Sequence, residues 1–145
     1  MGSLWPKEQP NLAWIGKRMS SILVIEDDSD LLLMLRQTLA LAGYEVRTAT
    51  DGKQAAILCE VKPPDLVITD IYMPNKDGLE VIMDLRAKFP KTKIIAISGQ
   101  VTNKNMLPVA LSLGAARTLA KPFQPQELLK LVEEVLPAAV QKSKP

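Results

Sequence analysis

The feature that most constrains the fold is a rhythm of short apolar runs alternating with longer segments, which begins at Ser21 and continues to about Leu136. Short apolar or β-branched runs are typical of strands buried on both faces, whereas the longer segments have helical length and period. The expected strands are residues 22–25, 45–48, 66–69, 94–97 and 117–120. The expected helices are residues 30–42, 52–61, 79–88, 106–113 and 126–136.

Five strand–helix units in succession predict an α/β fold. Crossovers of helical length allow all strands to be parallel, and right-handed connections place helices on both faces of the sheet. We therefore expect a doubly wound, flavodoxin-like three-layer sandwich with five helices and the strand order 2-1-3-4-5. Gly43 and Gly114 stand where helices are expected to end, and Pro108 suits a first helical turn.

The chain outside this rhythm is irregular. Residues 1–20 contain two prolines and show no sustained period, which indicates an amino-terminal arm whose first residues are consistent with a cloning remnant. Its tryptophans, Trp5 and Trp14, dock on the domain or on a partner, or else belong to a flexible tail. The expected domain is residues 21–136, followed by a polar tail at 137–145.

Composition narrows the class of protein. A length of 145 residues with 47% hydrophobic residues suits one domain, and a net charge of +2 with scattered lysines argues against direct nucleic-acid binding. Arg36 and Gln37 interrupt the longest apolar stretch, so we expect no membrane association. Cys59 is the single cysteine and reads as a small apolar filler on a helix, which indicates a reducing compartment, the cytoplasm.

The chain contains no histidine. This excludes an imidazole base, Ser-His and Cys-His nucleophile pairs, histidine zinc ligands and an internal phosphohistidine. Any phosphohistidine in its chemistry must come from another chain.

An aspartate, Asp70, ends the apolar run at 66–69, and Pro74 and Gly78 then turn the chain into a loop. A carboxylate beside a buried strand is costly unless it is paired or bound to a metal. Open α/β sheets place their ligands at the carboxyl ends of their strands. Asp70 is therefore expected in a site.

Polar side chains also follow the other strands: Glu26 and Asp27 the first, Ser98 the fourth and Lys121 the fifth. At ~4 Å and an effective dielectric of ~20 each pair of carboxylates costs about 4 kcal/mol, so a cation is expected. Oxygen ligands without histidine or thiolate favour Mg²⁺. Lys121 and the Ser98 hydroxyl could contact a phosphoryl oxygen. Alternatively, each is an independent polar residue at a wet strand end.

Residues 21–136 resemble the receiver domain of two-component response regulators, the chemotaxis-regulator-like fold. The shared motifs are an acidic doublet after the first strand and D-x-x-M-P with D-G after the third. They continue with Ser before a small residue after the fourth strand, G-A before the fifth and K-P-F after it.

The resemblance implies that Asp70 accepts a phosphoryl group from a partner's phosphohistidine. Mg²⁺ would be held by Asp27, Asp70 and the backbone carbonyl of Tyr72, with Glu26 acting through water. The third acid of the run, Asp28, lies beyond the family doublet and suits a helix cap.

Ser98 and Lys121 would bind the phosphoryl oxygens, and the bond before Pro122 would be cis. The family implies a signalling switch rather than an enzyme, with a histidine kinase or phosphotransfer protein and a downstream protein as partners.

One residue departs from the family pattern, and two others occupy positions that affect the lifetime of the phosphoryl group. Thr118 stands where the family usually has Tyr or Phe, so the sequence does not predict how the signal leaves the phosphorylation site. Tyr72 and Gln100 occupy positions that tune the attack of water on the phosphoryl group, and bulk at Tyr72 is expected to lengthen its lifetime.

The first helix has one face for the core and apolar residues beyond it. The core face is expected to comprise Leu31, Leu32, Leu35, Leu39 and Ala42. Leu33, Met34 and Leu41 fall outside this face. They are incidental surface residues, are covered by the amino-terminal arm, or form a docking patch for a kinase or phosphotransfer helix.

Three other functions are alternatives: a phosphatase, a nucleotide-binding protein and a protein-interaction module. A phosphatase of the haloacid-dehalogenase type needs a second acid at the position of Tyr72. A flavodoxin-like nucleotide-binding protein needs a phosphate-binding loop after the first strand, where the acids of this chain would repel a phosphate. The third alternative is closer to the receiver domain itself: a receiver-like interaction module in which phosphorylation is vestigial. The nine residues of tail hold no effector, so the chain is a stand-alone regulator or a piece of a larger regulator or hybrid kinase.

Overall fold

A computed structural model describes residues 19–72, 78–99 and 106–136. Most of the expected arm with its two tryptophans, Gln100 and the tail at 137–145 lie outside the described residues. The domain boundaries therefore stay predictions.

Five parallel strands form a single sheet in the order β2-β1-β3-β4-β5, as predicted. The strands are β1 (Ser21–Ile25), β2 (Glu45–Ala49), β3 (Leu66–Asp70), β4 (Lys93–Ser98) and β5 (Arg117–Ala120). The helices are α2 (Ser29–Leu41), α3 (Gly52–Val61), α4 (Gly78–Lys88), α5 (Leu107–Leu113) and α6 (Pro125–Val135). Most boundaries lie within one residue of the expected ones, and β3 extends to include Asp70.

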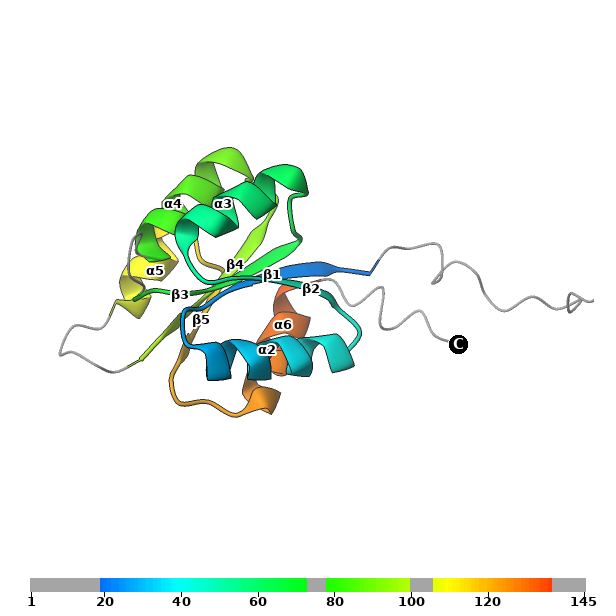
Figure 1. Cartoon of the computed structure of the whole chain (residues 1–145). Helices are drawn as coiled ribbons and strands as arrows, with labels where there is room; N and C mark the ends of the chain where they lie inside the picture. The colour runs from blue at the N-terminus through cyan, green and yellow to red at the C-terminus, as the bar shows by residue number, and fades with distance from the viewer. Residues whose placement is uncertain (1–18, 73–77, 100–105, 137–145) are drawn as a thin grey trace, which may run out of the picture.

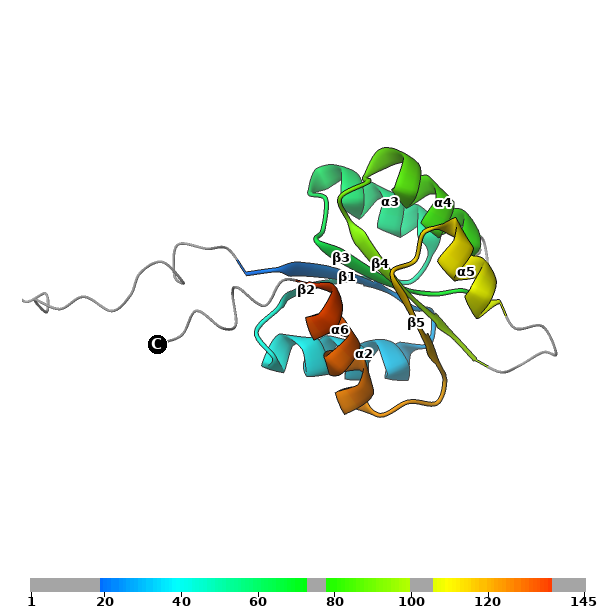
Figure 2. The ribbon, with the colours of Figure 1, turned by 180° about the vertical axis from the view of Figure 1, so that it is seen from behind.

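The helices form two outer layers. Figure 1 and the reverse view in Figure 2 show α3, α4 and α5 on one face of the sheet and α2 and α6 on the other. Side chains alternate between the faces of a strand, so β1 contributes Leu23 and Ile25 to the core under α3, α4 and α5. Ile22 and Val24 enter the core under α2 and α6. Burial on both faces explains the continuous apolar runs.

Local signals fix the helix ends. The Asp28 carboxylate accepts hydrogen bonds from the backbone N–H groups of Asp30 (3.0 Å) and Leu31 (3.2 Å), which confirms it as the cap of α2. Gly43 and Gly114 follow α2 and α5 with φ angles of 101° and 125°, values that glycine adopts without strain. No helix among the described residues is long and apolar enough to cross a membrane.

The prediction for the surface of α2 was wrong at one position. Met34 is half-buried and packs against the core under α2 and α6, and its sulfur accepts a 3.6 Å hydrogen bond from the Thr38 hydroxyl. Its long, flexible side chain reaches the core from the edge of the expected face. Leu33 and Leu41 are exposed, as expected, with 52% and 90% of their surface accessible.

Cys59 is buried in the core under α3 and α4, which confirms its interpretation as an apolar filler. Burial raises the pKa of its thiol, although the charge of Arg47 opposes this shift. The thiolate that would react is therefore disfavoured.

Candidate functional site

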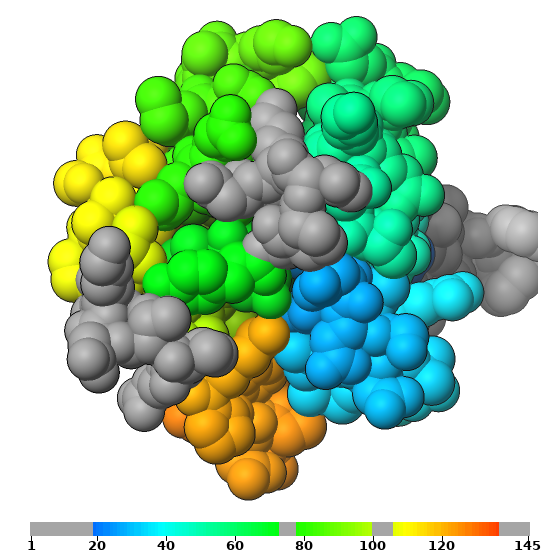
Figure 3. Space-filling model, turned by 60° about the vertical axis from the view of Figure 1, so that its left-hand side comes forward, coloured from blue at the N-terminus to red at the C-terminus, as the bar shows by residue number. Residues whose placement is uncertain are grey.

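The parallel sheet brings the carboxyl ends of its strands to one edge. Glu26 and Asp27 follow β1, Asp70 ends β3, Ser98 ends β4 and Lys121 follows β5. Figure 3 faces this edge, and the blue, green and orange segments that follow β1, β3 and β5 meet there. Because β1 and β3 are neighbours with helices on opposite faces, the acids lie at the topological switch point of the sheet.

Three carboxylates gather at this point. One oxygen from each of Glu26, Asp27 and Asp70 lies within 4.8 Å of the other two. Glu26 and Asp70 are 1% and 5% exposed, whereas Asp27 is open to solvent. Their convergence agrees with the expectation from the strand exits.

Lys121 reaches back to this cluster from the end of β5. Its ammonium donates hydrogen bonds to Glu26 Oε1 (3.2 Å) and Asp70 Oδ2 (3.1 Å), and one quarter of its side chain is exposed. Three carboxylates and one ammonium leave the site with two net negative charges when all are ionised. The site can therefore accept further positive charge.

Backbone contacts fix the position of Asp70. The N–H of Tyr72 donates to Asp70 Oδ1 (3.2 Å), and the hydroxyl of Thr69 donates to the Asp70 carbonyl (2.9 Å). Ile71 continues the pairing with β4 by donating its N–H to the carbonyl of Ile97 (2.9 Å). The carboxylate is thus held at the strand exit before any ligand arrives.

The pKa of Glu26 is raised from 4.5 to about 7. Burial is the main cause, the N–H of Asp28 opposes it, and the charge of Asp70 adds to it. Lys121 lowers the pKa but does not outweigh burial. Glu26 is therefore protonated in part of the population near neutral pH, and a bound cation would favour its ionised form.

The pKa of Lys121 is raised above its ordinary value. Burial lowers it, but the hydrogen bond to Asp70 and the charges of Asp70 and Glu26 raise it by more. The ammonium is therefore a fixed positive charge at neutral pH.

The donor set fits a hard divalent cation. It consists of three carboxylate oxygens without histidine or thiolate, a type of ligand that Mg²⁺ prefers, and the exposed side of Asp27 leaves room for water. The acidic cluster can thus hold Mg²⁺. The backbone of Tyr72 follows Asp70 directly in the loop, and its side chain is 39% exposed.

Two further predicted residues, Ser98 and Pro122, lie at the same edge, and Thr118 lies within β5. Ser98 is buried, its carbonyl accepts a hydrogen bond from the N–H of Lys121 (2.8 Å), and its hydroxyl donates to the carbonyl of Gly99 (3.2 Å). The Lys121–Pro122 peptide bond is cis, as the resemblance implies. Thr118 lies in β5 opposite Ala96 and is half-buried.

The model of the response regulator receiver domain matches residues 22–133 of the chain. The chain belongs to the response regulator receiver domain family. Phosphorylation on an aspartate is implied by this membership.

Curated relatives agree with this assignment. The receiver domain is 33% identical over 115 residues to the alkaline phosphatase synthesis transcriptional regulatory protein PhoP of Bacillus subtilis, covering 79% of this chain and 48% of PhoP. It is 36% identical to the transcriptional regulatory protein PrrA of Mycobacterium tuberculosis, covering 79% of this chain and 49% of PrrA. It is also 34% identical to the Bacillus subtilis protein CcdB, covering 81% of this chain and 98% of CcdB. The chain thus spans about half the length of PhoP and PrrA.

Solved structures give the same fold. The chemotaxis response regulator CheY4 of Vibrio cholerae is 32% identical with a TM-score of 0.75, and the match covers 82% of this chain and all of that one. A putative response regulator from Chloroflexus aurantiacus is 31% identical with a TM-score of 0.75, covering 81% of this chain and 98% of that one.

Two site features were missed from the sequence. The direct contact of the buried Glu26 side chain with Lys121 was not predicted, and the expected support of Mg²⁺ by Glu26 through water stays a prediction. Gly78 was interpreted only as a chain breaker, whereas its N–H donates to the carbonyl of Ile71 (2.8 Å) and its Cα packs on the backbone of Asp70. A glycine that opens a helix after an acidic strand end was the available signal for the second contact.

Proposed function

We propose that Asp70 is the phosphoryl acceptor of this receiver domain. The observation that carries the proposal is the placement of the Lys121 ammonium within hydrogen-bond distance of both Asp70 and Glu26, with Asp27 completing the acidic cluster. An ammonium 3.1 Å from the acceptor carboxylate is suitably placed to meet an incoming phosphoryl oxygen.

The reaction is an in-line displacement at phosphorus. A carboxylate oxygen of Asp70 forms the new O–P bond while the P–N bond of a partner's phosphohistidine breaks, and its electron pair stays on the imidazole nitrogen. The Asp70 backbone contacts hold the nucleophile in place, and Lys121 offsets negative charge on the transferred group.

Asp27, Asp70 and the carbonyl of Tyr72 would hold Mg²⁺, with Glu26 in support. When bound, Mg²⁺ would neutralise charge on the phosphoryl oxygens and on the acidic cluster. The elevated pKa of Glu26, about 7, supports the idea that this cluster is built to be balanced by a cation.

The switch would follow from Ser98 and Lys121. After transfer, the Ser98 hydroxyl would give up its bond to the Gly99 carbonyl and donate to a phosphoryl oxygen, moving the segment after β4. Thr118 would transmit this movement with less bulk than the aromatic residue usual in the family.

Partners are expected on both sides of this reaction. A histidine kinase or phosphotransfer protein would supply the phosphoryl group, since the chain has no histidine, and a downstream protein would recognise the switched surface. The single, buried thiol of Cys59 fits a cytoplasmic setting.

The test is intact-mass measurement after treatment with acetyl phosphate and MgCl₂. The wild type should gain the mass of one phosphoryl group, and EDTA should prevent the gain. Asp70→Asn should gain nothing, whereas the matched control Asp28→Asn, which keeps a capping side chain outside the cluster, should react like the wild type.

Equal phosphorylation of Asp70→Asn would overturn the assignment. A folded wild type that binds Mg²⁺ but never gains mass would also contradict it, and would favour an interaction module that has lost phosphorylation.

A further inference from the structure

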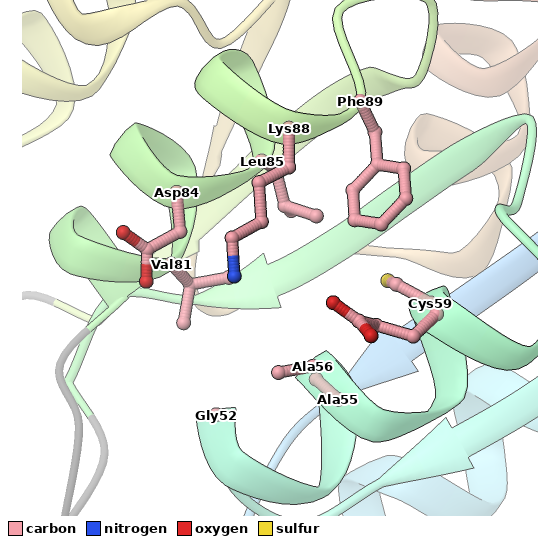
Figure 4. A pocket seen from close by; sticks show the side chains of 10 residues that line it. Gly52, Ala55, Ala56, Cys59, Val81, Asp84, Leu85, Lys88 and Phe89 are labelled. Atoms are coloured by element: carbon pink, nitrogen blue, oxygen red, sulfur yellow. The ribbon is translucent and has the colours of Figure 1, made fainter.

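A small pocket of about 60 Å³ lies between α3 and α4, and none of the proposed phosphoryl-site residues line it. Figure 4 shows Ala55, Ala56 and Cys59 of α3 facing Leu85 and Phe89 across this hollow. Its walls are mainly apolar, so they can contact one apolar side chain of another segment.

The apolar surface continues outward over α3. Ile57 and Val61 are 65% and 77% exposed, and with Ala56 and Glu60 they line a second, shallower hollow. Ala56 and Glu60 line both hollows, so the two are adjacent. Such a stretch on an amphipathic helix indicates a surface that another chain segment covers.

One end of the pocket lies at the edge of the sheet where β1 begins. The Phe89 carbonyl accepts the N–H of Thr92 (3.0 Å), and the Thr92 hydroxyl donates to the carbonyl of Pro64 (2.7 Å). The next residue, Asp65, donates its N–H to the carbonyl of Ser21 (2.9 Å). A short series of contacts therefore links the pocket to the start of the domain.

The preceding segment is long enough to reach the pocket. Trp14 stands seven residues before Ser21, and seven extended residues span about 23–25 Å. From β1 through β3 to β4 the separation is two strand spacings, or about 10 Å. The segment 11–15 contains Leu12, Ala13, Trp14 and Ile15 in succession.

We propose that residues 11–15 of the same chain occupy the α3–α4 pocket, with the Trp14 indole as anchor beside Ala56, Cys59 and Phe89. Indole is a flat apolar group, and the pocket offers it apolar side chains from both helices and from Phe89. Lys17 and Arg18 follow the anchor, and Glu60 offers a carboxylate at the rim.

Intrinsic fluorescence tests this directly, because both tryptophans of the chain lie in residues 1–18. In full-length Trp5→Phe, Trp14 is the only indole. Its emission should be shifted to shorter wavelength, and acrylamide should quench it several-fold less than in a peptide of residues 1–18.

A matched pair of variants locates the docking site in that background. Ala56→Arg fills the mouth of the pocket from an exposed helical position and should abolish both the shift and the protection. Ala40→Arg, at an exposed position of α2 on the opposite face of the sheet, should change neither. Circular dichroism verifies that both variants fold.

The fluorescence readout does not depend on phosphorylation.

Three results would overturn the proposal. Trp14 could be quenched equally in the intact chain and the peptide. Protection could be lost in Ala40→Arg but kept in Ala56→Arg, which would put the segment on α2. Protection could disappear on dilution, which would assign the pocket to the segment of a second copy.

Discussion

Gly78 packs against Asp70 so closely that no side chain fits between them. A Cβ atom at residue 78 would overlap the carbonyl oxygen of Asp70 and lie 2.6 Å from the Cα atom of Ile71. The first turn of α4 therefore rests directly on the strand end that carries the proposed acceptor.

Gly78→Ala is expected to displace this strand end. Overpacking of this kind typically costs about 1–3 kcal/mol, and phosphorylation by acetyl phosphate should slow because Asp70 moves. Gly43→Ala is the control: its left-handed φ makes it cost about 1–2 kcal/mol, but no atom lies within 4 Å of its Cβ. Urea unfolding and phosphorylation rates check both variants, and equal slowing in both would contradict the steric explanation.

Lys121→Met tests the charge that spans the cluster. The variant keeps an apolar stem but leaves two buried carboxylates without their ammonium, so it should lose stability toward the lower end of ~3–5 kcal/mol at neutral pH without Mg²⁺. Phosphorylation should fall by ~10²–10³, as for loss of one transition-state donor. Lys130→Met, at an exposed position of α6, should be neutral in urea unfolding and intact-mass kinetics. A fully active Lys121→Met would exclude the proposed role of the ammonium.

Glu26 gives the metal-free domain a pH dependence of known sign. Its pKa is 4.5 ordinarily and about 7 in the folded protein, so the native state binds the extra proton between these values. The contribution of Glu26 to the free energy of unfolding therefore falls as pH rises from 4.5 to 7, by about 3 kcal/mol at most.

Glu26→Gln should remove this penalty. In EDTA, its stability relative to the wild type should increase from pH 5 to pH 8, as measured by urea unfolding. Added Mg²⁺ should narrow the gap at pH 8 by stabilising the wild type. A difference that stays constant with pH would show that Glu26 is ionised in the fold throughout this range.

Tyr72 is expected to shield the phosphoryl group. Its side chain lies two residues after Asp70 and is partly exposed, so its bulk can limit the approach of water. Tyr72→Ala should lose phosphate several-fold faster after desalting, as followed by intact mass, whereas Tyr72→Phe should keep the wild-type lifetime. An alanine variant that decays no faster would count against shielding.

Leu33 is expected to contact the phosphate donor. Leu33 is exposed on α2, the helix that follows the acidic doublet. Leu33 and Leu41 are the exposed members of the expected docking patch, because Met34 packs against the core. Leu33→Glu should slow transfer from a phosphohistidine protein while leaving reaction with acetyl phosphate unchanged. Leu111→Glu, at an exposed position of α5, is the control. Equal slowing with both donors would refute docking at Leu33.

The fold was predictable because its signals are local and repeated. Central strands that are buried on both faces need uninterrupted apolar runs, and these runs are visible in the sequence. In a parallel sheet the polar strand ends then lie at one edge, where Asp70 and Lys121 meet. Asp28 as a cap followed from side-chain chemistry alone.

The features that were not predicted depend on three-dimensional geometry. The half-burial of Met34 depends on side-chain flexibility, the direct bond between Glu26 and Lys121 on how far a lysine stem reaches, and the contact of Gly78 on the angle at which α4 meets β3. No spacing in the sequence encodes these quantities.

The bond between Glu26 and Lys121 joins residues 95 positions apart in the chain. During synthesis the acids after β1 are made first, and the ammonium of Lys121 is added only after the last strand. A nascent or truncated polypeptide lacking β5 would thus expose an uncompensated acidic hollow, and competence to receive a signal would coincide with completion of the domain.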